Sequence, residues 1–130
     1  MSEDTRLRSP LGRAVGLGSA KEGVAHWWAQ RISAVALIPL SLWFVAALIA
    51  LTGADRATLV AWLHAPLPAI VAVLLLIAVF YHMSLGVQVV VEDYVHSEWV
   101  KISALVLNKL VAFALAISGI FAVLRLAFQG

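Results

Sequence analysis

The side chains that can do chemistry are concentrated in one segment, Phe80 to His96, which reads FYHMSLGVQVVVEDYVH. Within it, His82 is the one side chain of the apolar run 68–91 that readily takes up a proton. Hydrocarbon penalises such a residue unless something compensates it, so its presence in the run predicts a functional site. Neutral imidazole is a common nitrogen ligand for metals and a frequent axial ligand of haem iron. The expected chemistry at His82 is therefore metal or haem ligation.

Three more residues of this segment share or adjoin the face of His82 if the segment is helical. Asp93 follows His82 by eleven residues, which at 100° each make three turns plus about 20°, or roughly 16 Å of rise. Gly86 lies one turn after His82, where a missing side chain lets a flat ring or another backbone approach closely. Tyr94 adds a phenol beside Asp93. The stripe thus combines an imidazole in the hydrocarbon, a gap, and an acidic and phenolic pair near the membrane surface.

Each of these residues also has a plainer interpretation. His82 can hydrogen-bond a neighbouring helix, and Gly86 can serve close helix packing. Asp93 can be solvated at a helix end, and Tyr94 can belong to the aromatic belt at the membrane surface. The joint occurrence of all four favours a shared site.

The segment His26 to Phe44 contributes a second set of polar residues. Arg31 at its start can reach lipid phosphate or pair with a carboxylate such as a haem propionate, and the sequence leaves both open. His26 is placed at the interface without a defined role. Small polar residues in apolar helices mostly pack helices together, which is the role expected for Ser33, Ser41 and Ser84.

The elements that must position these residues follow from the composition. Of the 130 residues, 63% are hydrophobic and 12% charged, and the runs 32–51, 68–91 and 110–124 contain no Asp, Glu, Lys or Arg. About 20 apolar residues span a hydrocarbon core of ~30 Å. The runs show no period of two, and a backbone in lipid must satisfy its own hydrogen bonds, so they are expected to be helices.

The sequence therefore predicts an all-α, three-transmembrane-helix membrane anchor. Helices are expected at about 29–52, 66–94 and 101–128, in a membrane domain of residues 25–130 that follows an N-terminal cytoplasmic tail, residues 1–24. Lys109 and Arg125 are expected to reach the lipid headgroups. This composition excludes a soluble enzyme. The chain has no cysteine, which excludes disulfides and thiolate-bound metals, and its net charge of +2 is too small to indicate nucleic acid as a partner.

The distribution of positive charge predicts the orientation. Basic residues are most numerous before the first span, at Arg6, Arg8, Arg13, Lys21 and Arg31, and the loop 92–101 ends in Lys101. The loop 53–67 contains one Lys or Arg residue, Arg56. Cytoplasmic segments carry the excess of Lys and Arg, so the N-terminus and the loop 92–101 are expected in the cytoplasm.

The number of deep histidines has a consequence for haem binding. Six-coordinate haem needs two axial ligands, and the predicted spans contain one deep histidine, His82. Either a second chain supplies the other ligand or the site is not a bis-histidine haem. Three helices with one axial histidine look like half of a haem-binding bundle that a partner subunit completes.

Taken together, these residues resemble a known family, the hydrophobic membrane anchor subunits of succinate dehydrogenase, respiratory complex II. The resemblance covers about residues 22–128. Its most specific part is the histidine, the glycine four residues on and the Asp-Tyr pair eleven residues on, here His82, Gly86, Asp93 and Tyr94. The start of the first span, Gln30 to Ala34, also matches.

The resemblance implies a function for each of these positions. His82 would be one axial ligand of haem b, with the other supplied by the cytochrome b subunit, and Arg31 would lie near the haem propionates. Tyr94 would hydrogen-bond a carbonyl of ubiquinone, with Asp93 aiding proton delivery. The two membrane chains would dock the flavoprotein and iron–sulfur subunits at the bacterial inner membrane. The chain would then be a non-catalytic subunit surrounded by membrane lipid.

Three alternatives remain beside this interpretation. The first is the anchor of a related fumarate reductase, because sequence does not fix the direction of electron flow. The second is a cofactor-free membrane scaffold whose helices pack through small residues. The third, a small proton or solute carrier, is disfavoured because only one span shows a deep ionisable residue.

Overall fold

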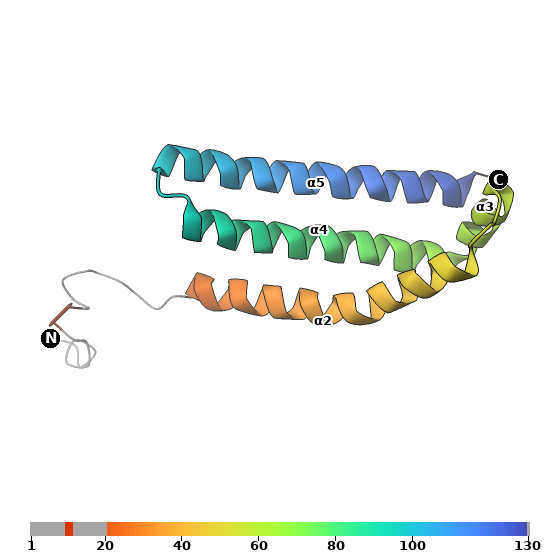
Figure 1. The fold of residues 1–130 in the computed structure, drawn as a ribbon, viewed down its shortest axis with the longest axis horizontal. Coiled ribbons are helices and arrows are strands. Elements are labelled where there is room, and N and C mark those ends of the chain that lie inside the picture. Colours follow the sequence, from red (N-terminus) through yellow and green to blue (C-terminus); the bar gives the residue numbers. More distant parts are fainter. Residues whose placement is uncertain (1–9, 12–20, 130) are drawn as a thin grey trace, which may run out of the picture.

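A computed structural model describes residues 10–11 and 21–129 of the chain (Figure 1). The described residues form long helices joined by short turns and contain no strand. The helices are α2 (Lys21–Ala50), α3 (Arg56–His64), α4 (Pro66–Tyr94) and α5 (Glu98–Phe128). The predicted all-α fold is confirmed.

Three of the helices are long and apolar enough to cross a membrane. The qualifying segments are Gly23–Ala50, Pro66–Tyr94 and Glu98–Phe128, with 28, 29 and 31 residues. At 1.5 Å per residue they are roughly 42–46 Å long, which exceeds a hydrocarbon core of ~30 Å. Each helix therefore continues beyond the hydrocarbon into the headgroup region. The protein is an integral membrane protein with three spanning helices, as the sequence predicts.

The first helix begins earlier than expected, at Lys21 rather than near residue 29. An apolar run marks the part of a helix that lies in hydrocarbon, whereas Lys, Glu, Gln and Arg are good helix formers that extend it into the interface. Residues 21–24, assigned to the tail by sequence, are thus helical. Residues 1–9 and 12–20 of that tail lie outside the described residues, and Arg6, Arg8 and Arg13 are among them. The orientation of the chain across the membrane therefore stays a prediction.

The loop 53–67 contains a short helix, α3, that hydropathy did not reveal. Asp55 caps it by accepting a hydrogen bond from the backbone N–H of Thr58 at 2.9 Å, the usual role of Asp before a first turn. Hydrogen bonding by the side chain and backbone of Thr58 lowers the pKa of the Asp55 carboxyl. Pro66 at the first position of α4 and Gly53, with a φ of 79°, set the turns on either side.

The three long helices lie side by side with α4 in the middle (Figure 1). Helix α4 packs against both α2 and α5. Between α2 and α5 themselves, no two Cα atoms of the described residues lie within 8 Å. The start of α2, the end of α4 and the start of α5 meet at one end, which we call the α2-start end (Figure 1). α3 packs against α4 and α5 at the other end. Beyond Pro39, α2 bends in its second half, as a proline inside a helix predicts.

This arrangement leaves few side chains buried. Within the described residues the buried side chains are those of Leu63, Leu85, Ala112, Ser33 and Ser84. Two of these five are serines, and each makes a hydrogen bond between helices. Most large apolar side chains face outward, where lipid or another subunit must cover them.

Candidate functional site

The imidazole of His82 is fixed by a hydrogen bond to the neighbouring helix. Its Nδ1 lies 2.9 Å from Oγ of Ser33 on α2, and the Ser33 hydroxyl also donates to the backbone carbonyl of Gln30 at 3.0 Å. Ser33 is 6% exposed, so water does not compete for these bonds. The plainer interpretation of His82, a hydrogen bond to another helix, is therefore correct for Nδ1. Among the described residues Nε2 has no hydrogen-bond partner, and it remains available to a ligand.

A second polar contact fixes α5 against α4 near the same depth. Asn108 Nδ2 donates to the Ser84 carbonyl at 2.9 Å and lies 3.4 Å from Ser84 Oγ. Lys109 follows directly and, with Tyr81 and Ser84, lines a cavity between the two helices. Lys109 thus lies at nearly the depth of His82, which sequence alone did not anticipate.

Next to the Ser33–His82 contact, toward the α2-start end, is a cavity between α2 and α4. Its volume is about 450 Å³. Because the two helices run antiparallel, the turns of α2 before Ser33 face the turns of α4 after His82. The lining residues are Gly23, His26, Trp27, Gln30, Arg31, Gly86 and Val89. We call this space the α2–α4 cavity; it brings Arg31 and Gly86 together.

Gly86 provides open space in the wall of this cavity. A Cβ placed on Gly86 would meet no atom within 4 Å. By contrast, a Cβ on Gly119 of α5 would lie 3.2 Å from both terminal methyl carbons of Leu76. Gly119 therefore serves close helix packing, while Gly86 does not approach any described part of this chain. The gap that the sequence predicts at Gly86 is present.

The α2–α4 cavity also holds polar atoms that lack partners. His26 Nε2 and Gln30 Oε1 are buried and make no hydrogen bond within the described residues. Leaving such groups unpaired costs about 1–3 kcal/mol each. The Arg31 guanidinium lies 5.4 Å from the ring centroid of Trp27, a cation–π contact that leaves its donors free to bind an anion. The free donors of Arg31 suit a ligand edge that carries carboxylates, whereas the Gln30 oxygen needs a hydrogen-bond donor.

Asp93 and Tyr94 lie further along, at the last two positions of α4. Ser33 on α2 faces His82 on α4, and the two helices run antiparallel. Asp93 and Tyr94, eleven and twelve residues after His82, are therefore level with the first turn of α2. Both side chains are exposed, Tyr94 at 78%, and neither lines the α2–α4 cavity. The structure therefore arranges His82, the cavity and the Asp93–Tyr94 pair in sequence from the interior to the α2-start end.

The other histidines lie away from this line. His64 is exposed at the end of α3, on the opposite side of the molecule, and His96 is exposed in the turn between α4 and α5. In the part of the chain that the structure describes, no three His, Asp or Glu side chains gather into a metal-binding cluster. A metal at His82 must therefore be held chiefly by other means, as haem iron is by its porphyrin.

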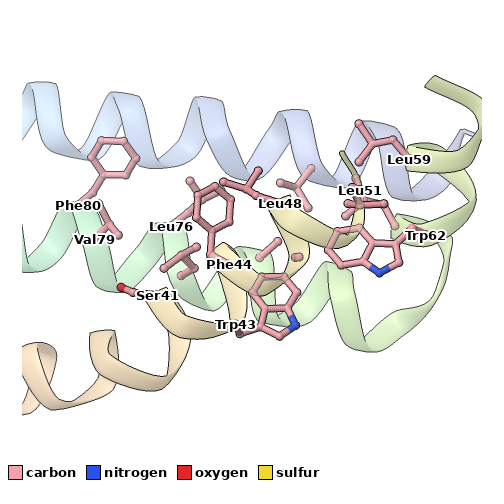
Figure 2. A pocket seen from close by; sticks show the side chains of 15 residues that line it. Ser41, Trp43, Phe44, Leu48, Leu51, Leu59, Trp62, Leu76, Val79 and Phe80 are labelled. Atoms are coloured by element: carbon pink, nitrogen blue, oxygen red, sulfur yellow. The ribbon is translucent and has the colours of Figure 1, made fainter. Parts of the chain in front are cut away.

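A larger apolar cavity lies toward the α3 end and differs from this site in chemistry. Its volume is about 460 Å³, and Trp43 and Trp62 stack beside it with ring centroids 5.6 Å apart. Figure 2 shows Phe44, Leu48 and Leu76 among the side chains that fill its wall. Ser41 supplies a hydroxyl, and among the described residues that line this cavity none has a titratable side chain. Its lining is therefore less suited to metal ligation or proton transfer than that of the α2–α4 cavity.

Sequence reasoning missed three residues of the site. Ser33 was assigned to helix packing, His26 had no role, and Gln30 was noted only as part of a motif. The signal available was their common face on one helix, since residues 26, 30 and 33 are spaced by four and three. Hydropathy does not reveal such a polar face when apolar residues surround it.

Fold and site together define an α-helical integral membrane subunit whose polar site lies between two spanning helices. The family of succinate dehydrogenase/fumarate reductase transmembrane subunits matches residues 5–122. The chain belongs to this family.

Individual relatives agree with this assignment. The chain is 33% identical to a succinate dehydrogenase hydrophobic membrane anchor subunit of Rickettsia bellii, over 90% of this chain and 94% of that one. It is 31% identical to the subunit of the same name from Paracoccus denitrificans, over 93% of each chain. A succinate dehydrogenase membrane anchor subunit of Reclinomonas americana is 28% identical, over 71% of this chain and 79% of that one. No solved structure gives a significant match.

The two glycines give a first prediction. Gly86→Ala adds a methyl group where no atom lies within 4 Å, and alanine is the better helix former by about 1 kcal/mol. We expect the thermal stability of the purified chain in detergent to be equal or higher. Gly119→Ala is the matched control, because its Cβ must displace Leu76, and it should be less stable than Gly86→Ala. Equal destabilisation by both would show that Gly86 is packed against protein.

Proposed function

We propose that this chain anchors succinate:ubiquinone oxidoreductase in the membrane, binds haem b together with the cytochrome b subunit, and contributes to the ubiquinone reduction site. The observation that carries this proposal is His82. Its Nδ1 is held by Ser33, its Nε2 is free, and a cavity lined by Arg31 and Gly86 lies beside it. The relatives named as succinate dehydrogenase anchors support it.

The residues around the α2–α4 cavity fit a haem group. His82 supplies a neutral imidazole nitrogen, and Gly86 leaves room for a flat ring. Arg31 supplies a planar guanidinium that pairs well with a carboxylate, and the unpaired His26 nitrogen and Gln30 oxygen offer further polar contacts. When bound, haem b supplies a site for one-electron transfer. In this chain His82 would ligate the iron, and Arg31 would pair with a carboxylate of the group.

The shape of the chain supports the need for a second membrane subunit. The layer of α2, α4 and α5 leaves both of its faces without a covering helix in the described residues (Figure 1). His82 is the one histidine deep in these spans, so a bis-histidine haem would take its second ligand from another chain. A cytochrome b subunit packed on one face of the layer supplies both the missing ligand and the missing cover.

The Asp93–Tyr94 pair suits a ubiquinone site at the membrane surface. An isoprenoid tail partitions into lipid, whereas reduction of the head group takes up two protons from water. Tyr94 is exposed where a phenolic O–H can donate a hydrogen bond to a quinone carbonyl, and the Asp93 carboxylate beside it can relay a proton. Both lie at the α2-start end, where the iron–sulfur and flavoprotein subunits would dock.

The choice between succinate dehydrogenase and fumarate reductase rests on the relatives. The family description includes both enzymes, but the relatives given above are all named as succinate dehydrogenase subunits. Since the sequence contains no cysteine, cysteine-bound clusters belong to another subunit. This chain therefore does not oxidise succinate by itself and acts as an anchor.

The role of His82 is tested by absorption spectroscopy of the whole complex. In dithionite-reduced membranes that contain the complex, His82→Ala should abolish or strongly weaken the b-type α-band, because an axial ligand is lost. His64→Ala is the control, since His64 is exposed at the opposite end, and should leave the band intact. An intact complex without any b-type band would remove haem from the proposal.

The role of Tyr94 is tested by comparing two electron acceptors. Tyr94→Phe removes only the hydroxyl, so we expect quinone reductase activity to fall about 10-fold or more while succinate oxidation by a soluble artificial acceptor continues. Tyr81→Phe, an exposed tyrosine further inside α4, is the control and should leave both activities unchanged. Equal loss of both activities with Tyr94→Phe would indicate failed assembly instead.

The role of Arg31 is tested by redox titration of the haem. Removing a positive charge from beside the porphyrin disfavours the reduced state, so Arg31→Leu should lower the haem midpoint potential more than it changes the KM for quinone. Arg56→Leu, at the α3 end, removes an equal charge from an exposed position and should leave the midpoint unchanged. A change in quinone KM without a change in midpoint would place Arg31 in the quinone pocket.

A further inference from the structure

The hydroxyl of Ser33 makes two hydrogen bonds with a single hydrogen. It donates to the Gln30 carbonyl at 3.0 Å, within its own helix. The same oxygen lies 2.9 Å from Nδ1 of His82, on the neighbouring helix. Because a hydroxyl has one hydrogen and two lone pairs, the second bond uses a lone pair of Oγ as the acceptor. The arrangement that satisfies both contacts therefore has His82 Nδ1 as the donor.

This assignment fixes the tautomer of the imidazole. A neutral histidine carries its proton on one ring nitrogen, and the other nitrogen keeps a lone pair. With the proton on Nδ1, the lone pair is on Nε2. Ligating histidines in metal sites usually hold their second nitrogen in this way, with its N–H donated to a fixed acceptor.

We propose that Ser33 is the positioning residue for His82: it holds the ring in the Nδ1-protonated tautomer and so presents the Nε2 lone pair to the haem iron. The iron is part of the proposed function, on which this half of the inference rests. The tautomer itself is a property of this chain, and it exists before any cofactor binds.

The surroundings make Ser33 more than a packing residue. Its side chain is 6% exposed, and in the described residues it makes the one side-chain hydrogen bond between α2 and α4. Within the described residues the group at Nδ1 is a hydroxyl and not a carboxylate, and a hydroxyl is the weaker acceptor. A hydroxyl acceptor still adds electron density to Nε2, which favours the oxidised iron. Losing it should therefore raise the midpoint potential.

The first experiment observes the tautomer in the haem-free full-length chain. The chain is labelled with ¹⁵N-histidine, purified in detergent, and its two ring nitrogens are distinguished by their ¹⁵N shifts and ring-proton couplings. For His82 we expect a protonated Nδ1 and an unprotonated Nε2. In Ser33→Ala, we expect a mixture of the two tautomers. A His82 protonated on Nε2 in the unchanged chain would overturn the inference.

Two further variants separate positioning from packing. Ser84→Ala is the matched control, because Ser84 is another buried serine, 5% exposed, whose hydroxyl does not contact His82. It should leave the tautomer as it is. Ser33→Thr retains a hydroxyl at the same position and should restore the Nδ1-protonated form. If Ser84→Ala changes the tautomer as much as Ser33→Ala, the effect comes from packing and the inference fails.

The second experiment follows the haem in the whole complex. Ser33→Ala should weaken haem retention about 10-fold, as is usual when the partner of a ligating histidine is removed. It should also raise the midpoint potential and shift the low-spin EPR signal, with Ser33→Thr close to the unchanged complex. Unaltered retention, potential and EPR signal in Ser33→Ala would overturn the positioning role. If the complex without any substitution lacks b-type haem, the proposed function fails. The tautomer experiment on the haem-free chain still tests the role of Ser33 in that case.

Discussion

The structure depends on two polar contacts that fix the central helix inside an apolar layer. His82 on α4 is tied to Ser33 on α2, and Ser84, two residues further along α4, is tied to Asn108 on α5. Apolar packing alone gives little preference for one register in a membrane, because lipid tails are as apolar as leucine side chains. An unpaired polar group in hydrocarbon is costly, so these contacts select the register of all three helices.

The register also determines how the site is assembled. Once Ser33 faces His82, the antiparallel run of α2 and α4 brings Arg31 and His26 opposite the turn that contains Gly86. The same run places Tyr94 beyond the cavity, at the end of α4. A deep imidazole, a polar cavity and a surface acid–phenol pair are therefore not separate features. They are successive levels of one helix pair, and a shift of either helix by one turn would misalign them.

The sequence predicted the spanning helices well because hydropathy measures the property that inserts them. The ends of α4, Pro66 and Tyr94, coincide with the predicted range, and the apolar run 68–91 lies between them. The start of α2 and the whole of α3 were missed, because helices outside the hydrocarbon leave no such signal. The stripe from His82 to Tyr94 was predictable from spacing within one helix. Ser33 was not, because its partner is 49 residues away and spacing does not fix how two helices are rotated against each other.

The unpaired polar atoms of the α2–α4 cavity favour the binding of a further hydrogen-bonding group. His26 Nε2 and Gln30 Oε1 are buried without partners among the described residues, and each costs about 1–3 kcal/mol in that state. A subunit or bound group that supplies their hydrogen bonds removes this cost, and a ligand that binds only the folded state stabilises that state. Covering the exposed apolar faces of the layer with another subunit would also stabilise the folded chain. Both features indicate that the chain is more stable as part of a larger membrane assembly than alone.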